Sequence, residues 1–247
     1  MPLRLARSGG RADLVIDLPP VNVLDVEALG ELARLVRSVT DRVLVLSGLP
    51  RAFSAGVSVA EHAPEPAAIE TMLAAMRQAL VALVETPAVT IASISGACLG
   101  GGAELAAACD LVLVADDARI GFPEIRLGCF PPGATALLPL RIGEARAADW
   151  ILTGRTLSGR EAAHAGFAAR SVTASDLEPE TARLAERLAT TGAAALAEAR
   201  DLLRAERRRA LAEALPRAED AYRRLTGDAD LARLVEGFGK RGRKPAD

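Results

Sequence analysis

Three consecutive glycines and one glutamate interrupt an otherwise small and apolar stretch, Ala97-Cys98-Leu99-Gly100-Gly101-Gly102-Ala103-Glu104-Leu105-Ala106-Ala107-Ala108-Cys109. The apolar neighbours of Glu104 predict that its carboxylate points into the protein interior. An ionised carboxylate is rarely buried without a partner, because the loss of hydration costs several kcal/mol or raises its pKa. Glu104 is therefore the first candidate for a catalytic residue.

The segments around this stretch alternate between strand-like and helix-like patterns. Runs rich in Val, Ile and Leu, typical of buried strands, lie at residues 14–17, 43–47, 89–94 and 111–115. Segments 25–39 and 69–84 carry apolar residues at helical spacing, and a short helix fits between the glycines and Asp110. The alternation predicts an α/β fold.

From Pro139 onward the pattern is almost continuously helical. We expect helices over residues 143–152, 158–165, 176–189, 193–215 and 228–238, and one more strand over 168–172. Ser158 followed by Glu161 predicts a capping box, and Pro216 is expected to break or kink its helix. We divide the chain into an α/β core of residues 1–190 and a helical C-terminal region of residues 191–247.

Composition limits the classes of protein to consider. Half of the 247 residues are hydrophobic, and the net charge of -2 argues against a strong field for nucleic acid or anionic membranes. Three cysteines, an odd number in apolar contexts, fit a reducing compartment better than a disulfide framework. Residues 1–10 lack the apolar stretch of a signal peptide, and no apolar run approaches the roughly 20 residues of a membrane helix. These features predict a soluble, cytoplasmic protein.

Two glycine-containing loops follow predicted strands, at residues 51–62 and 95–102. Glycines before a helix leave backbone N–H groups free to bind an anion, although a plain tight turn explains the glycines equally well. A phosphate-binding P-loop does not fit, because Gly102 is followed by Ala103 and Glu104 rather than by Lys and Ser or Thr. The Rossmann spacing also fails after Gly96.

A second carboxylate, Glu124, lies among apolar residues in the stretch Ile120-Gly121-Phe122-Pro123-Glu124-Ile125-Arg126-Leu127-Gly128. Two acids in apolar surroundings suit paired general acid and base chemistry. The alternatives are that Glu104 favours the positive end of its own helix and that Glu124 pairs with Arg126 or Arg119. Two histidines and no Cys-x-x-Cys pair are too few for a metal cluster, so no metal is expected.

The loops and acids together resemble the crotonase superfamily, the enoyl-CoA hydratase/isomerase family. Its first motif matches Phe53-Ser54-Ala55-Gly56-Val57-Ser58-Val59-Ala60-Glu61, its second matches residues 96–106, and its third is approximated by residues 120–128. The order and spacing of the three motifs agree, and the resemblance covers nearly the whole chain.

The resemblance implies a spiral of ββα turns, a helical C-terminal region that serves in trimerisation and as a lid, and an acyl-CoA thioester substrate. By motif position, the backbone N–H groups of Val57 and Gly101 would form an oxyanion hole, while Glu104 would activate water and Glu124 would protonate the α-carbon. Substrate-binding positions implied in the same way are Ala55, Gly56, Val59, Gly100, Phe122 and Pro131. The family chemistry needs no cofactor, because coenzyme A is part of the substrate, and it implies a homotrimer or homohexamer and a role such as fatty acid metabolism.

Three departures from the family pattern bear on the substrate. Ser58 replaces a common Asp, Phe122 replaces a common Gln, and residues 129–134 read Cys-Phe-Pro-Pro-Gly-Ala in place of a glycine-rich stretch. The last departure is similar to a subgroup that hydrates cyclic dienoyl-CoA esters. Hydration of a 2-enoyl-CoA is the leading hypothesis. The alternatives are an isomerase or another acyl-CoA reaction, and a non-catalytic acyl-CoA or RNA-binding protein that uses the basic clusters 207–209 and 240–244.

Overall fold

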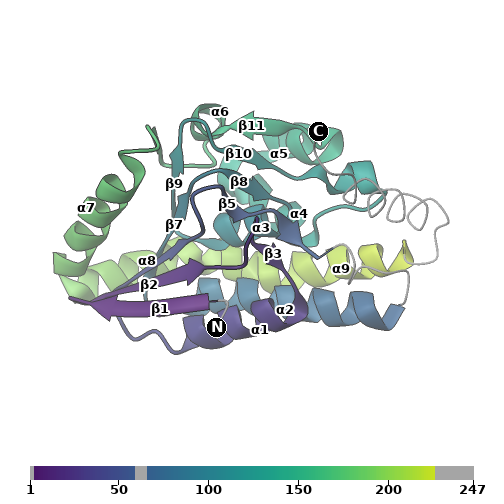
Figure 1. Ribbon diagram of the computed structural model, residues 1–247. Coiled ribbons are helices and arrows are strands. Elements are labelled where there is room, and N and C mark those ends of the chain that lie inside the picture. The colour runs from purple at the N-terminus through teal and green to yellow at the C-terminus, as the bar shows by residue number, and fades with distance from the viewer. Residues whose placement is uncertain (1–2, 59–65, 226–247) are drawn as a thin grey trace.

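A computed structural model describes residues 3–58 and 66–225 of the chain. Its larger sheet has six strands in the order β1-β2-β4-β7-β9-β12 (Figure 1). These strands are β1 (Leu3–Ser8), β2 (Arg11–Ile16), β4 (Val43–Ser47), β7 (Val89–Ile94), β9 (Leu111–Ala115) and β12 (Arg170–Val172). Only the β1–β2 pair is antiparallel, and all other neighbours run parallel.

A smaller sheet has the order β11-β10-β8-β5, and the short strands β3 (Val23–Leu24) and β6 (Gly56–Val57) form a third. The strands of the smaller sheet are β5 (Ala52–Ser54), β8 (Ala97–Leu99), β10 (Arg119–Gly121) and β11 (Thr156–Ser158). Strands β4, β7 and β9 of the large sheet are each followed by a strand of the small sheet and then by a helix. This repeated ββα order is the crotonase-type fold.

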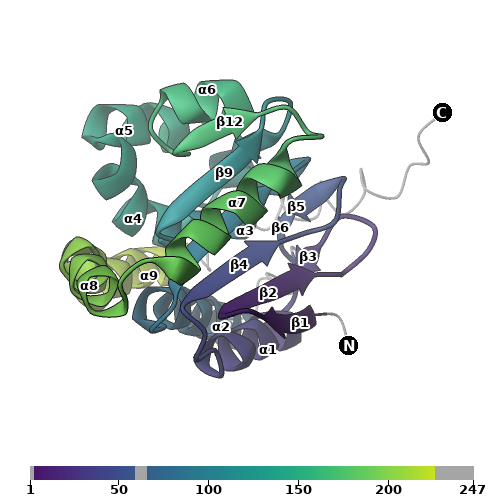
Figure 2. The same ribbon diagram turned by 90° about the vertical axis from the view of Figure 1, so that its left-hand side faces the viewer.

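The helices that complete these turns are α1 (Val26–Arg37), α2 (Pro66–Glu85), α3 (Gly101–Ala108) and α4 (Pro132–Ile142). They are followed by α5 (Glu144–Thr153), α6 (Gly159–His164) and α7 (Leu177–Thr190). Helix α7 packs across one face of the large sheet, against β2, β4, β7 and β9 (Figure 2). Helix α3 contacts β5, β6 and β8 as well as α2 and α4, so the glutamate it carries lies at the centre of the molecule.

Residues 193–224, called the C-terminal rod below, run back along α2 as a long helix with one interruption (Figure 1). Helix α8 (Ala193–Arg209) passes into a π-helical turn, Ala210–Ala214, and then into α9 (Leu215–Arg224). Pro216 lies in the first turn of α9, directly after the π turn, and has no N–H to donate to the preceding turn. The expected irregularity near Pro216 therefore takes the form of a π turn, and α9 packs on both α2 and α4.

Much of this architecture agrees with the sequence-based expectations, including β4, β7 and β9 and the capping box of Ser158 and Glu161. Strand β1 was missed, and so was α4, because its prolines at positions 132 and 139 obscured a helical pattern. The expected helix 228–238 lies outside the described residues. Helix α2 is long and apolar enough to span a membrane by length and composition, contrary to expectation, but 56% of that window is buried inside the protein.

The C-terminal rod is attached to the core through Arg204, whose side chain is fully buried. Its guanidinium donates to Asp110 and to the carbonyl oxygens of Thr86 at 2.6 Å and Ala88 at 2.7 Å. Arg207 adds an ion pair to Asp110 at 2.5 Å. The surrounding charges lower the pKa of Asp110 against the opposing effect of burial, so this carboxylate stays ionised.

Replacing Arg204 with Met should lower the free energy of unfolding by about 3–5 kcal/mol, because Asp110 loses its main partner in a buried position. Urea denaturation monitored by circular dichroism measures the change. Arg209→Met, which removes an exposed pair with Glu206 on the same helix, should cost no more than about 1 kcal/mol. Equal costs for the two variants would contradict the anchoring role of Arg204.

Candidate active site

Glu104 lies in the first turn of α3, and only 4% of its surface is exposed. Its Oε1 accepts a hydrogen bond of 2.8 Å from the backbone N–H of Ala134. Ala134 belongs to the first turn of α4, where N–H groups have no partner within the helix and the dipole favours negative charge. The carboxylate is therefore stabilised by a helix other than its own, and the alternative that it serves only its own helix does not hold.

The start of α4 is built so that this carboxylate can approach it closely. Pro132 lies at the first helical position, where a backbone N–H has no acceptor within the helix, so a proline there removes no hydrogen bond. A Cβ atom at Gly133 would lie 2.9 Å from Glu104 Oε1 and 2.7 Å from Leu80 Cδ1. The Pro-Pro-Gly-Ala departure from the family pattern thus forms the binding site for the Glu104 carboxylate.

Glu124 lies in the 3-10 helix Pro123–Leu127 that follows β10. The residue is partly exposed, but its Oε2 is buried and has no hydrogen-bond partner among the described residues. Neither Arg126 nor Arg119 forms an ion pair with it in the described part of the chain, so that alternative fails. A Cβ atom at Gly100 would lie 2.6 Å from Glu124 Oε1, which places this carboxyl group against the loop that leads to Glu104.

The two carboxyl groups have raised pKa values with distinct causes. Burial raises the pKa of Glu104 to about 7, while hydrogen bonds from the Ala134 and Gly133 backbone oppose the rise. Burial also raises the pKa of Glu124 to about 8, and the charge of Glu104 contributes further. The coupled pair is therefore expected to share one proton near neutral pH, and the hydrogen bond to the Glu104 carboxylate favours placing the charge there and the proton on Glu124.

Two backbone N–H groups lie next to the acids. The N–H of Gly101 is at the first position of α3 and has no acceptor within that helix. Ser58 N–H donates to Leu24 on β3 at 2.8 Å, so the preceding N–H, of Val57, points to the opposite side of β6. A Cβ atom at Gly101 would lie 3.5 Å from the Val57 nitrogen, which brings the two donors into one neighbourhood.

A small cavity of about 20 Å³ adjoins Glu104, with room for about one water molecule. Apolar side chains of α2 and α9 form most of its wall, together with one ion pair between Arg77 and Glu219. The residues that line it are Leu73, Met76, Arg77, Leu80, Glu104, Pro132, Gly133, Leu215 and Glu219. The cavity therefore lies between the acid on α3 and the C-terminal helix α9.

The other predicted site residues have different surroundings. Ala55 is half-buried and donates to Val21, and Gly56 lies against the backbone of Leu99. Phe122 is fully buried and packs edge-to-face on Trp150 at 5.5 Å, which favours a core role over the predicted contact with substrate. Pro131 is buried at the N-cap of α4, and it is the next two residues that line the cavity. Val59 lies outside the described residues.

Sequence reasoning missed three residues at this site. Arg77 falls within an apolar helix pattern, and Glu219 lies in a strongly charged stretch that gives no sign of its burial. Tyr222, one turn beyond Glu219, is buried against Cys129 and Phe130, whose ring is 5.6 Å from its own. The amphipathic spacing of Leu215, Glu219 and Tyr222 was the available signal, since these positions share one face of a helix.

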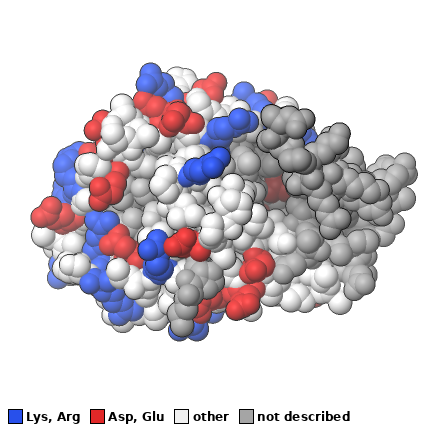
Figure 3. Space-filling model, viewed as in Figure 1, with Lys and Arg blue, Asp and Glu red and all other residues white. Residues whose placement is uncertain are grey.

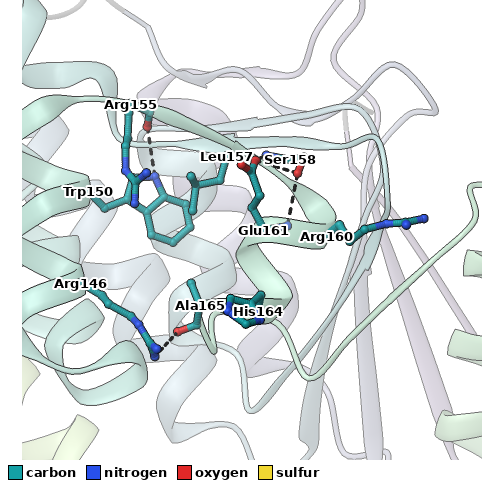
Figure 4. Close-up of a pocket in the computed structure, with 9 residues that line it drawn as sticks. All are labelled: Arg146, Trp150, Arg155, Leu157, Ser158, Arg160, Glu161, His164 and Ala165. Atoms are coloured by element: carbon teal, nitrogen blue, oxygen red, sulfur yellow. Dashed lines mark hydrogen bonds between the residues drawn. The ribbon is translucent and has the colours of Figure 1, made fainter.

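A much larger cavity, about 820 Å³, lies between α5 and α6 and has none of the site residues in its wall. Figure 4 shows Trp150 in its wall, where the indole N–H donates to the Arg155 carbonyl (3.1 Å), and Arg146 donating to the Ala165 carbonyl. Its basic side chains at 155 and 160 pair with Asp149 and Asp116. Size alone therefore does not identify the active site here, because this cavity lacks grouped acids with raised pKa values.

Other kinds of site find little support in the part of the chain that the structure describes. No group of three or more metal-ligating side chains occurs there, and all three cysteines are free and buried. Burial raises the pKa of the Cys98 thiol, so it is a poor nucleophile. Arg207, Arg208 and Arg209 are each ion-paired, and basic and acidic side chains are interspersed on the face in Figure 3.

Comparison with known proteins identifies the family of this chain. The sequence profile of the enoyl-CoA hydratase/isomerase family matches residues 8–243. The match extends over most of the chain, including all three motif regions. The chain therefore belongs to the enoyl-CoA hydratase/isomerase family, within the crotonase superfamily.

Individual relatives include hydratases. The chain is 36% identical to cyclohexa-1,5-dienecarbonyl-CoA hydratase of Thauera aromatica over 170 residues, which cover 66% of this chain and 64% of that protein. It is 34% identical to a probable enoyl-CoA hydratase of Mycobacterium bovis over 79% of this chain and 77% of the relative. The solved structure of an enoyl-CoA hydratase from Mycobacterium avium subsp. paratuberculosis aligns with a TM-score of 0.88 at 26% identity, covering 100% and 98% of the two chains.

The raised pKa of Glu124 predicts a characteristic dependence of stability on pH. A carboxyl group whose pKa rises on folding favours the folded state below its unfolded value of 4.5 and loses that contribution as pH approaches about 8. The stability of Glu124→Gln relative to the unmodified protein should therefore increase as pH rises through this window, by at most about 1.4 kcal/mol per pH unit. Urea denaturation at several pH values measures the difference. Glu178→Gln, at an exposed position of α7, is the control. A pH-independent difference for Glu124→Gln would contradict the raised pKa.

Proposed function

We propose that this protein adds water across the double bond of a 2-enoyl-CoA thioester. The observation that carries the proposal is the buried Glu104 and the partly buried Glu124 beside the N–H groups of Val57 and Gly101. Family membership supports an acyl-CoA substrate, and the hydratase names of the relatives support the reaction. Coenzyme A enters as part of the substrate, so the proposed chemistry needs no cofactor.

The two N–H groups would bind the thioester oxygen. As water adds, electrons of the double bond move toward this oxygen and give it enolate character. Preorganised backbone donors stabilise such charge without reorganisation, and the loss of one donor in other enzymes costs about 3 kcal/mol. The first turn of α3 adds the positive end of a helix dipole at the same point.

The two glutamates divide the proton transfers. Glu104, the carboxylate, would accept a proton from water as the water oxygen bonds to the β-carbon. Glu124, the protonated partner, would give its proton to the α-carbon, so that one H and one OH are added in total. The raised pKa values of Glu104 and Glu124, about 7 and about 8, suit a base and an acid that work near neutral pH. A proton must return from Glu104 to Glu124 before the next cycle.

An isomerase remains the alternative, because double-bond migration needs only one acid/base group, at the position of Glu124. Hydration is favoured because Glu104 is also present, buried and held by α4. The RNA-binding alternative loses support at the cluster 207–209, which is occupied by ion pairs, whereas the cluster 240–244 lies outside the described residues. The likeness to the Thauera enzyme makes a cyclic acyl group one candidate substrate.

The leading experiment replaces Glu104 with Gln. Hydration of crotonyl-CoA, followed by loss of conjugated thioester absorbance, should fall by at least about 100-fold, because the base that activates water is lost. Glu70→Gln, at an exposed position of α2, should leave the rate unchanged. Acyl-CoA binding without turnover by the unmodified protein on any enoyl ester would refute the proposal. Double-bond migration that survives in Glu104→Gln would favour the isomerase.

We also propose that the chain self-associates, as a trimer or hexamer, in the cytoplasm. Leu202 and Leu203 on α8 are 76% and 77% exposed, and adjacent large apolar side chains on a helix favour contact with another surface.

Light scattering should give a mass several times 25.7 kDa, and the double change Leu202→Glu/Leu203→Glu should shift it toward the monomer. Arg209→Glu on the same helix should leave the assembly intact. A monomeric mass for the unmodified protein would contradict self-association.

A further inference from the structure

The ion pair between Arg77 and Glu219 has no part in the mechanism above, yet it lines the cavity next to Glu104. Glu219 is 1% exposed, and its Oε1 accepts from Arg77 Nε at 2.9 Å, while its Oε2 accepts from Arg77 Nη2. Burying the Glu219 carboxylate is costly, whereas the side chain of its partner Arg77 is 40% exposed. Because the ion pair lies in the cavity wall, a role in ligand binding is a better explanation.

Holding α9 against α2 does not explain the pair. Arg223 on α9 already binds Glu70 on α2 through two hydrogen bonds, of 2.6 and 3.1 Å, at the surface. That second ion pair joins the same two helices without burying a carboxylate. Glu70 does not line the cavity and therefore provides a control, although its partner Arg223 also lies 4.0 Å from Glu219 Oε2.

The sequence order along α2 shows how far the Arg77–Glu219 ion pair lies from Glu104 and the paired N–H groups. Leu80 packs near Gly133, next to Glu104, and Met76 packs near Gly101, next to the paired N–H groups. Arg77 precedes Leu80 by three residues, about 5 Å along the axis of α2. An acyl group whose β-carbon lies at Glu104 therefore reaches the ion pair after a few further carbons, between Leu73 of α2 and Leu215 of α9.

We propose that Arg77 and Glu219 recognise a neutral hydroxyl group on the distal part of the acyl chain, so that the preferred substrate is a hydroxylated enoyl-CoA rather than a plain alkyl one. This inference rests on the proposed hydratase function. The pair carries no net charge, so it does not favour a distal carboxylate or ammonium group. A hydroxyl group donates to the Glu219 carboxylate and accepts from an Arg77 N–H at the same time. The cavity of about 20 Å³ beside the pair has room for one oxygen-sized group.

The test compares hex-2-enoyl-CoA with its ω-hydroxylated counterpart as substrates. The unmodified enzyme should prefer the hydroxylated ester in kcat/KM by about 10- to 100-fold, because only the hydroxyl group adds hydrogen bonds to Glu219 and Arg77. The apolar double change Arg77→Met/Glu219→Leu should abolish or reverse the preference. Glu219→Gln, which keeps the shape of the side chain, should reduce it, and Glu70→Gln should preserve it. Because each ratio is measured within one variant, loss of folded protein cancels.

Two results would overturn the inference. One is an unmodified enzyme that prefers the alkyl ester. The other is an equal loss of rate on both esters in the Arg77 and Glu219 variants, which would assign the pair to the reacting water or to helix packing. If no enoyl ester is hydrated, the proposed function fails, and calorimetric binding of hexanoyl-CoA against ω-hydroxyhexanoyl-CoA still tests the recognition. Equal affinities there would reject the hydroxyl site independently.

Discussion

The hydrogen bond between the Glu104 carboxylate and the first turn of α4 is the interaction on which the site depends. Burial alone would favour a neutral glutamic acid, which could not take a proton from water. The backbone N–H groups of Gly133 and Ala134 lower the cost of its charge, so its pKa rises only to about 7. Burial raises the pKa of Glu124, and the charge retained at Glu104 raises it further, which favours a proton on Glu124.

The ββα spiral explains why these groups meet although they lie far apart in sequence. Strands β5, β8 and β10 run parallel in the small sheet, so the segments that follow them emerge at the same edge. Those segments carry Val57, then Gly101 with Glu104, and then Glu124. The site is completed by α4 and α9, which pack on each other and close the side away from the sheet.

The sequence predicted the turns of the spiral better than it predicted the surroundings of the acids. Glu104 and Glu124 stood out because charge is rare in apolar runs, and β4, β7 and β9 because buried parallel strands are continuously apolar. Helix α4 was missed because Pro132 and Pro139 resemble breakers, although one begins the helix and the other is tolerated within it. The burial of Glu219 could not be predicted, since it depends on how α9 docks on α2, a contact between residues 142 positions apart.

The π-helical turn at residues 210–214 connects two faces of the C-terminal rod that must both point inward. Upstream, Arg204 enters the core to reach Asp110, and downstream Leu215 and Glu219 face the cavity. A π turn accommodates one residue more than an α turn, so its length sets the rotation of everything that follows. Single-residue insertions or deletions in this turn would thus give evolution a way to present different side chains to the acyl group while the reacting glutamates stay unchanged.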